Sequence, residues 1–323
     1  MFFLDKGLHW IAKGKLSIFL FHKVPRQTDV LQPGDMDQAT FRRTISFIRQ
    51  HFELFPLAEA ANLLAAGRLP DRCASITFDD GYVDWLNGAA AILHEDGVPA
   101  TFFITTGQFE GRPMWHERLA HVVKHAGDAG LDTRFCRLPR LATTTLADKV
   151  KAVSALEFHF KYIPPVLRDI YLEQLEELAA VSMADVPRMP VEDVGRIAQL
   201  GFEIGAHTHD HPILSLCDAQ QAQREIGEAK ERLEGIIGTR VTGFAYPNGR
   251  PGVDFTARHI DMVKAAGFHY AVTTQWGAVR QDTSPFQMPR FTPWGPSHQH
   301  MAVQVFRNIF KEAESLPENT MMT

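Results

Sequence analysis

Short apolar runs rich in β-forming residues alternate with stretches of helical periodicity along most of this chain, and this alternation limits the possible folds more than any other feature. Six runs are typical of buried strands: residues 16–21, 73–78, 98–104, 202–206, 241–245 and 270–272. Apolar residues at helical spacing lie between them, over residues 41–50, 57–66, 219–237 and 256–266. Alternating strands and helices favour parallel βα units over a β-sandwich. We therefore expect an α/β fold around a parallel sheet.

The stretch from about residue 111 to 190 breaks this rhythm. It contains helical spacing over residues 149–160, a double proline at 164–165 and a further helical pattern over residues 167–178. We predict a helical insertion in one large domain that spans residues 1–323. A lid, a cap over the substrate, a subunit contact and simple packing against the domain are all compatible with this pattern. With 45% hydrophobic residues the chain can bury a large core, which excludes a disordered or collagen-like protein.

Charge, hydropathy and cysteine content indicate which partners and which cellular location to expect. The chain carries 33 basic and 38 acidic residues and has no run of five Lys or Arg, so nucleic acid is not an expected partner. No segment approaches the roughly 18 uncharged apolar residues of a transmembrane helix. Asp5 and Lys6 interrupt the apolar start, which predicts no secretory signal and a cytoplasmic location. The three cysteines form neither a disulfide framework nor a metal-binding pair, and we expect buried thiols.

Two adjacent carboxylates end one of the predicted strands, in the sequence TFDDGY at residues 77–82. Sites in βα proteins are built at the carboxyl ends of strands. Asp79 and Asp80 would repel each other unless a cation lies between them, and a divalent metal bound by one leaves the other free as a proton acceptor. The alternative is an Asp-Asp-Gly turn with solvated carboxylates.

Three histidines follow another predicted strand, in the sequence HTHDHP at residues 207–212. Imidazole nitrogen suits zinc and similar metals. A short loop can direct His207 and His211 at one ion, while His209 is expected to point away. Two histidines with one carboxylate leave positions open for water and substrate, as in catalytic rather than structural metal sites. Surface histidines on a polar loop are the alternative.

Together and in this order, the two sequences resemble the polysaccharide deacetylase family, the NodB-homology carbohydrate esterases. The resemblance continues in FHKV at 21–24, PATFF at 99–103 and FAYPNG at 244–249. It covers about residues 16–110 and 190–292, and leaves the insertion and both termini outside. It implies a distorted (β/α) barrel of about seven parallel strands.

The resemblance also implies a mechanism. Asp80, His207 and His211 would bind a divalent metal, most often Zn²⁺, and Asp79 would be the general base. A metal lowers the pKa of a bound water and polarises the acetamide carbonyl, so that attack gives a tetrahedral oxyanion. The products are acetate and a free amine.

The chain departs from the family pattern in the sequence FAYPNG at 244–249, which corresponds to the family's third motif. The family's third motif commonly carries an arginine that pairs with the base, whereas this chain has Ala245, as in a subgroup that reads Phe-Ala-Tyr-Pro. We hypothesise that Arg290 supplies the missing cation from a later strand; an ordinary surface ion pair is the alternative. By resemblance, the backbone from Tyr246 to Asn248 would help to hold the oxyanion.

The histidine that serves as general acid in the family has no clear counterpart here. His22, at the end of the first strand, is one candidate, and His298 and His300, which we expect on a loop, are the others. Each is also explained as a satisfied or solvated histidine. Trp115 and His116, at the start of the insertion, are predicted either to line a sugar cleft or to be buried aromatics.

The predicted function is metal-dependent removal of an N-acetyl group from an amino sugar, in a surface polysaccharide or a lipid- or nucleotide-linked intermediate. One alternative keeps the metal and changes the substrate to a non-sugar acylamide or a formamide. The other is a glycan-binding barrel with weak catalysis. The sequence leaves the sugar, its carrier, the metal and the oligomeric state open.

Overall fold

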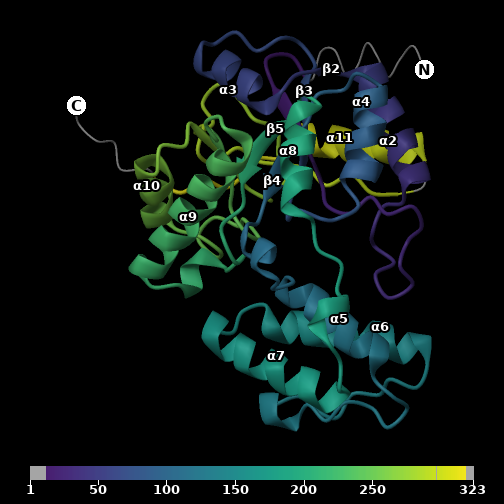
Figure 1. Cartoon of the computed structure of the whole chain (residues 1–323). Helices are drawn as coiled ribbons and strands as arrows, with labels where there is room; N and C mark the ends of the chain where they lie inside the picture. Colours follow the sequence, from purple (N-terminus) through teal and green to yellow (C-terminus); the bar gives the residue numbers. More distant parts are fainter. Residues whose placement is uncertain (1–11, 296, 318–323) are drawn as a thin grey trace.

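Seven strands run parallel in one curled sheet in the computed structural model, which describes residues 12–295 and 297–317 (Figure 1). The sheet order is β1-β3-β4-β5-β6-β7, and β2 pairs with β3. The strands are β1 (Leu16–Phe21), β2 (Glu53–Leu54), β3 (Cys73–Phe78), β4 (Thr101–Ile104), β5 (Glu203–Ala206), β6 (Gly243–Ala245) and β7 (Tyr270–Val272). The predicted α/β class is therefore confirmed. The prediction made from Asp5 and Lys6 lies outside the described residues.

The central strands are covered on both faces. β1 pairs with β3 along its whole length, from Leu16 opposite Cys73 to Phe21 opposite Phe78, and all of these residues are buried. Strands enclosed in this way have continuous rather than alternating apolar sequences, which is why the two runs stand out in the chain.

An irregular segment over residues 288–291 closes the sheet into a barrel. Met288 bridges to Val272 of β7, and Phe291 bridges to Phe19 of β1. Two backbone hydrogen bonds join Phe291 to β1, at 2.8 and 2.9 Å. The architecture is the distorted (β/α) barrel that the resemblance implies.

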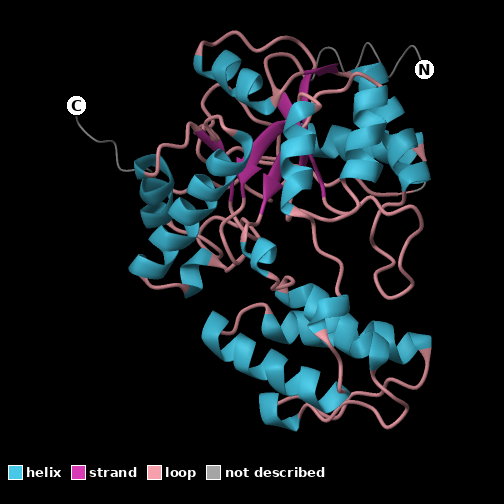
Figure 2. Ribbon diagram, in the orientation of Figure 1, coloured by secondary structure: helices cyan, strands magenta, loops and turns pink. Residues whose placement is uncertain are grey.

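Helices surround this sheet on its outer side (Figure 2). They are α2 (Gln38–His51), α3 (Leu57–Ala65), α4 (Ala91–Glu95), α8 (Val191–Gln199), α9 (Ala219–Ile237), α10 (Ala257–Ala265) and α11 (His298–Phe310). The loop predicted for His298 and His300 is wrong, because both residues lie in the first turn of α11, where the Ser297 side chain accepts from the N–H of His300. The first turn is polar, and the apolar spacing of this helix starts only at Met301.

The insertion forms a separate helical layer at the end of the barrel where β4 leaves the sheet (Figure 1). It consists mainly of α5 (Trp115–His125), α6 (Leu146–Phe160) and α7 (Pro165–Ala179). These helices share an apolar cluster of their own, which includes Leu119, Val122, Leu156, Phe160 and Leu172. The two ends of the insertion meet, since the Arg188 side chain donates to the carbonyl of Gly111 at 3.0 Å. None of the described helices is long and apolar enough to cross a membrane.

Candidate active site

The two adjacent aspartates occupy the turn at the carboxyl end of β3. The N–H of Asp79 still donates to Phe21 in β1, whereas Asp80 has a φ of 90° and Gly81 a φ of 96°. A side chain at Gly81 has no room, because a Cβ there would lie 2.4 Å from Nε2 of Gln108, the atom that donates to the Asp80 carbonyl at 3.0 Å. Positive φ at a non-glycine residue stores strain, which is frequent where a side chain has to be aimed.

The loop over residues 207–212, here called the histidine loop, also turns at residues with a positive φ. It begins directly after β5, where the N–H of His207 donates to Ile104 in β4, and His211 has a φ of 53°. The carboxylate of Glu225 in α9 anchors the loop by accepting the backbone N–H groups of His209 at 2.9 Å and Asp210 at 2.8 Å. His209 faces away from the other two rings, since its Nδ1 lies 2.9 Å from the Thr106 hydroxyl.

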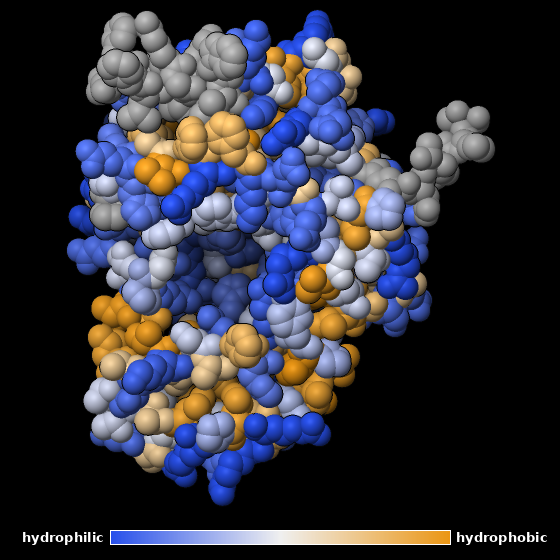
Figure 3. All heavy atoms as spheres, turned by 180° about the vertical axis from the view of Figure 1, so that it is seen from behind, coloured by the Kyte–Doolittle hydropathy of each residue, from blue (hydrophilic) through white to orange (hydrophobic). Residues whose placement is uncertain are grey.

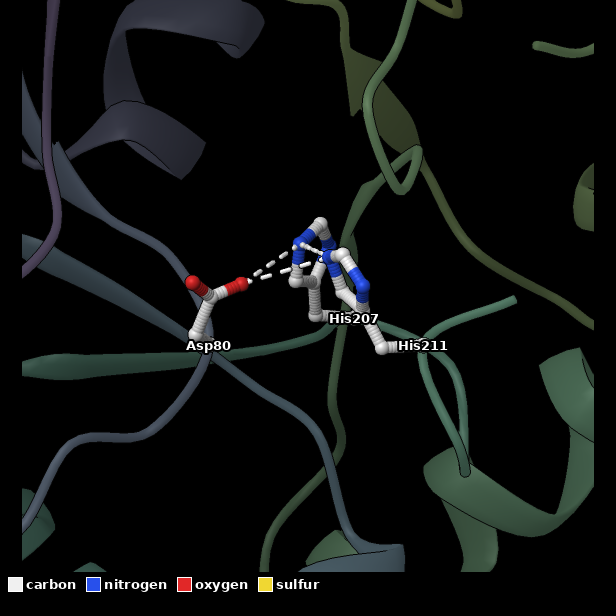
Figure 4. A group of neighbouring side chains, drawn as sticks. All are labelled: Asp80, His207 and His211. Carbon is white, nitrogen blue, oxygen red and sulfur yellow. Dashed lines mark hydrogen bonds and ion pairs between the residues drawn. The ribbon is translucent and has the colours of Figure 1, made fainter. Parts of the chain in front are cut away.

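Asp80, His207 and His211 meet at one point (Figure 4). Oδ1 of Asp80 lies 3.3 Å from Nε2 of each histidine, and the two Nε2 atoms are 3.1 Å apart. All three side chains are buried. In a tetrahedral zinc site with ligand bonds of about 2.0–2.1 Å, the ligand atoms lie about 3.3 Å from one another. The triangle therefore has the size that one bound ion requires.

The orientation of the His207 ring also indicates a site for a bound cation. Its Nδ1 lies 2.8 Å from the Ala245 carbonyl, which can only accept, so the proton of the neutral ring is on Nδ1. The lone pair on Nε2 then faces both a carboxylate oxygen and a second imidazole nitrogen. Such an arrangement is repulsive unless a proton or a metal cation lies between the three atoms. The donor set fits a divalent metal.

The protonation states of Asp80 and His211 agree with this assignment, whereas the neighbouring carboxylates draw His207 towards its charged form. Burial opposes the charge of Asp80, but His207 and His211 outweigh it and hold the pKa of this carboxyl well below its usual range. Burial lowers the pKa of His211 to about 3, so its imidazole is neutral. Burial also lowers the pKa of His207, although the carboxylates of Asp79 and Asp80 more than compensate and leave it raised.

Asp79 lies beside this triangle and is held by Arg290. The two guanidinium nitrogens Nη1 and Nη2 donate to the two carboxylate oxygens at 2.6 and 2.5 Å. Oδ2 of Asp79 is 3.8 Å from Nε2 of His207, beyond bonding distance. Burial raises the pKa of Asp79, but the charge of Arg290 outweighs it and the pKa stays below its ordinary value. Asp79 is thus an ionised carboxylate next to the donor set.

Arg290 comes from the segment that closes the barrel. It is fully buried, its Nε donates to the Thr273 carbonyl at 2.8 Å, and its guanidinium lies over the Phe103 ring. A surface ion pair, the alternative weighed for this arginine, is therefore wrong. The structure brings the cation to Asp79 from a neighbouring segment, while Ala245 is small and packed in the core.

The third motif passes under the same site. The backbone N–H of Tyr246 donates to Val272 in β7 at 3.2 Å, and Pro247 has no N–H to offer. Asn248 is half-buried with a φ of 59°, and its carbonyl accepts from the Thr274 hydroxyl. A role for this motif in holding an oxyanion stays a prediction.

Of the three candidate acids, His22 lies in the cleft beside the metal triangle. This cleft has a volume of about 760 Å³ and also takes in Tyr82 and His116, whose hydroxyl and Nε2 are 2.9 Å apart. The face in Figure 3 is hollowed between the barrel and the insertion, and mainly hydrophilic residues line the hollow. The described contacts of His298 are with Phe47 of α2 instead.

Sequence reasoning missed the residues that hold the site in place. Glu225 and Gln108 lie in segments that carry no motif, and only the fold brings them to the two loops. The three cysteines are buried and free, as predicted.

A family model and a curated relative both indicate the polysaccharide deacetylases. The family model described as polysaccharide deacetylase matches residues 66–145 and 176–271. The protein YxkH of Bacillus subtilis (strain 168), whose name assigns it provisionally to the polysaccharide deacetylases, is 21% identical over 291 residues, which is 88% of this chain and 75% of YxkH.

Two solved structures share the fold. The Streptococcus pyogenes deacetylase PplD, in complex with acetate, superposes with a TM-score of 0.61 at 14% identity, covering 92% of this chain and 99% of PplD. IcaB from Ammonifex degensii superposes with a TM-score of 0.59 at 16% identity, covering 90% of this chain and 97% of IcaB.

Proposed function

Because the chain belongs to the polysaccharide deacetylase family, we propose that it hydrolyses the acetamide of an N-acetylated amino sugar with the help of a bound divalent metal. One observation carries this proposal. A buried triangle of two imidazoles and a carboxylate lies next to a second carboxylate that is ionised and fixed by an arginine. A binding protein has no use for that second carboxylate.

Asp80, His207 and His211 would hold the metal, and Zn²⁺ is the ion we propose. Three protein ligands of this kind leave a coordination position for water or substrate. When bound, the ion makes its water acidic and polarises the acetamide carbonyl.

Asp79 is the proposed general base. Its carboxylate takes the proton of the attacking water, and the pair of hydrogen bonds from Arg290 keeps it ionised and correctly oriented. Arg290 is thus a positioning residue.

We assign protonation of the leaving amine to His22. Two imidazoles line the cleft, those of His22 and His116. Burial lowers the pKa of His116, so this ring holds little of the proton that the amine needs near neutral pH. His22 is the other imidazole that lines this cleft.

The cleft favours a sugar over a simple acylamide. Its lining is mixed polar and apolar, and Trp294, one of the lining residues, is 55% exposed. An exposed indole beside polar groups is suited to the face of a sugar ring. The amino sugar belongs either to a surface polysaccharide or to its lipid- or nucleotide-linked precursor.

A substrate panel tests the proposal. Acetate and formate release are measured with N-acetylglucosamine oligomers, lipid- and nucleotide-linked acetamido sugars, non-sugar acetamides and formamides. We expect acetate from sugars only, loss of activity with a chelator and recovery with Zn²⁺. Turnover restricted to non-sugar amides would replace the substrate class, and bound metal without any turnover would favour a glycan-binding barrel.

A further inference from the structure

A second, smaller cavity lies between the histidine loop and the insertion. Its volume is about 120 Å³, whereas a single water needs only about 10–15 Å³. It reaches the turn that carries Asp80, because Thr105 and Gln108 line it and both donate to the backbone carbonyl of Asp80. Asp210 and Pro212, the neighbours of His211, form part of the same wall.

Arg168 of α7 faces this cavity from the insertion. Its side chain is 4% exposed, and its guanidinium carbon lies 5.0 Å from the centroid of the Trp115 ring. Nε of Arg168 and Nε1 of Trp115 are both buried without a hydrogen-bond partner among the described residues. A buried donor left without an acceptor costs about 1–3 kcal/mol. Two such donors at one cavity indicate an acceptor that the chain itself does not supply.

Two helices begin at the same cavity. The N-caps of α5 and α7 are Met114 and Pro164, and neither offers a side-chain hydrogen bond to the free N–H groups of the first turn. Trp115, Pro165 and Val166, in those first turns, line the cavity. A helix N-terminus carries a partial positive charge and favours an anion. Both helices therefore add to the positive potential of Arg168.

The charges of Asp169 and Asp210 act on this arginine, but neither carboxylate forms an ion pair with it. Asp169 pairs with Arg118 at 3.5 Å and is half exposed, and the Asp210 side chain is also about half exposed. Glu225 is engaged with the histidine loop, and burial raises its pKa to about 7. No carboxylate of the described residues forms an ion pair with Arg168.

We propose that this cavity is a subsite for a compact oxyanion, a carboxylate or a phosphate, carried by the amino sugar whose acetamide lies at the metal triangle. The inference rests on the proposed function for the identity of the sugar, and on Arg168, Trp115 and the two helix N-termini for the charge. The planar guanidinium matches either oxyanion in a bidentate manner. The enzyme would then select acidic acetamido sugars over neutral ones.

A binding experiment tests the subsite without relying on turnover. Inorganic phosphate is titrated into the protein while the indole N–H signals are followed by NMR, and Trp115→Phe identifies the Trp115 signal. We expect phosphate to shift this signal, Arg168→Met to weaken the binding at least tenfold, and His207→Ala to leave it in place. The control Arg134→Met removes an exposed arginine of the insertion and should change nothing.

Kinetics then identify the ligand. We expect kcat/KM to be at least tenfold higher for N-acetylglucosamine 6-phosphate or N-acetylmuramic acid than for N-acetylglucosamine, and Arg168→Met to abolish this preference while sparing the neutral sugar. The acidic sugar with the higher kcat/KM shows whether the subsite prefers a phosphate or a carboxylate. If Arg168→Met does not fold, Arg168→Lys keeps the charge and should lose only part of the preference.

The two proposals fail separately. An unshifted Trp115 signal together with equal use of acidic and neutral sugars would overturn the subsite and leave the deacetylase intact. Phosphate binding that depends on Arg168, without acetate release from any sugar, would retain the subsite and overturn the proposed function.

Discussion

Arg290 takes the place of the arginine that the third motif of this chain lacks, because it pairs with Asp79 from another segment. The family pattern places an arginine where this chain has Ala245, yet the base is still paired with a guanidinium, which arrives 45 residues later in the sequence on the segment that closes the barrel. A buried pair of this kind is costly to break, because the remaining partner keeps an uncompensated charge. We therefore expect neither residue to tolerate replacement alone.

Replacing Arg290 with methionine tests its positioning role. The carboxylate of Asp79 loses both hydrogen bonds and its stabilising charge, so we expect kcat to fall about 100-fold with little change in KM. The pKa of Asp79 should rise, which moves the acid limb of the pH profile to higher pH. The profile and metal content are measured together.

Arg290→Lys is the matched control. It keeps a positive charge without the two-pronged geometry and should restore part of the acid limb and part of kcat. An acid limb that stays at the wild-type pH in Arg290→Met would contradict the role, even if kcat fell.

Residues with a motif could be predicted from sequence, and residues without one could not. Asp79, Asp80, His207 and His211 follow apolar strands, so their meeting point is implied by parallel strands that end at one edge. Arg168 lies within an ordinary amphipathic helix. Its importance arises only from what surrounds it after folding.

At the scale of elements, α9 controls the histidine loop through a single carboxylate. Glu225 accepts two successive backbone N–H groups of the loop, and these are the amides just before His211. Outer contacts that fix metal ligands typically change affinity or activity 10–100-fold when removed.

The affinity for Zn²⁺ depends on this anchor. Glu225→Ala should weaken Zn²⁺ binding 10–100-fold, because the loop loses its anchor, whereas Glu225→Gln retains an accepting oxygen and should bind nearly as well as wild type. Competition with a chromophoric chelator measures both. Equal affinities in all three proteins would show that the loop holds its shape without α9.

Glu225 also makes the free energy of unfolding depend on pH. Burial raises the pKa of Glu225 from 4.5 to about 7, so the folded state holds this proton more tightly than the unfolded chain. The resulting stabilisation is complete below pH 4.5 and is lost as the pH rises through about 7, a change of about 3 kcal/mol. Glu225→Gln should remove this slope from urea unfolding curves.

Glu231→Gln provides the control for that slope, since Glu231 is exposed on the same helix. A wild-type slope that persists in Glu225→Gln would mean that another group is responsible.

Periodicity predicted the long elements well and the short or polar ones poorly. The predicted helix over residues 219–237 coincides with α9. α8 was missed because it directly follows the insertion, and α11 because its first turn is polar. The closing segment at 288–291 has no regular strand pairing, so no strand pattern exists to be detected.

At the scale of the whole molecule, the chain consists of a barrel and a helical layer with separate apolar cores. The layer reaches the cleft through few contacts, among them Lys23 to Glu117 at 2.6 Å and the Tyr82 hydroxyl to His116. The metal triangle belongs entirely to the barrel, while Arg168 and Trp115 belong to the insertion. Chemistry and the proposed selection of the substrate are therefore carried by different parts of the fold.

This division can be tested by replacing residues 112–187 with a Gly-Ser linker of about five residues. The ends of the insertion lie within reach of one arginine side chain, so a short flexible linker can join them. We expect a folded barrel that binds Zn²⁺ normally, with KM for acetamido sugars raised at least tenfold and no preference for acidic ones. Loss of metal binding in a folded variant would show that the insertion shapes the triangle itself.

Metal content and acetate release, measured together in wild type, Asp79→Asn and His207→Ala, test whether a bound metal and the Asp79 carboxylate carry the hydrolysis. We expect about one metal ion and turnover in wild type, a retained ion with turnover lowered by about 10²–10⁴ in Asp79→Asn, and loss of both in His207→Ala. Equal metal content in all three proteins, with no acetate released by any of them, would contradict the assignment of both the ligands and the base.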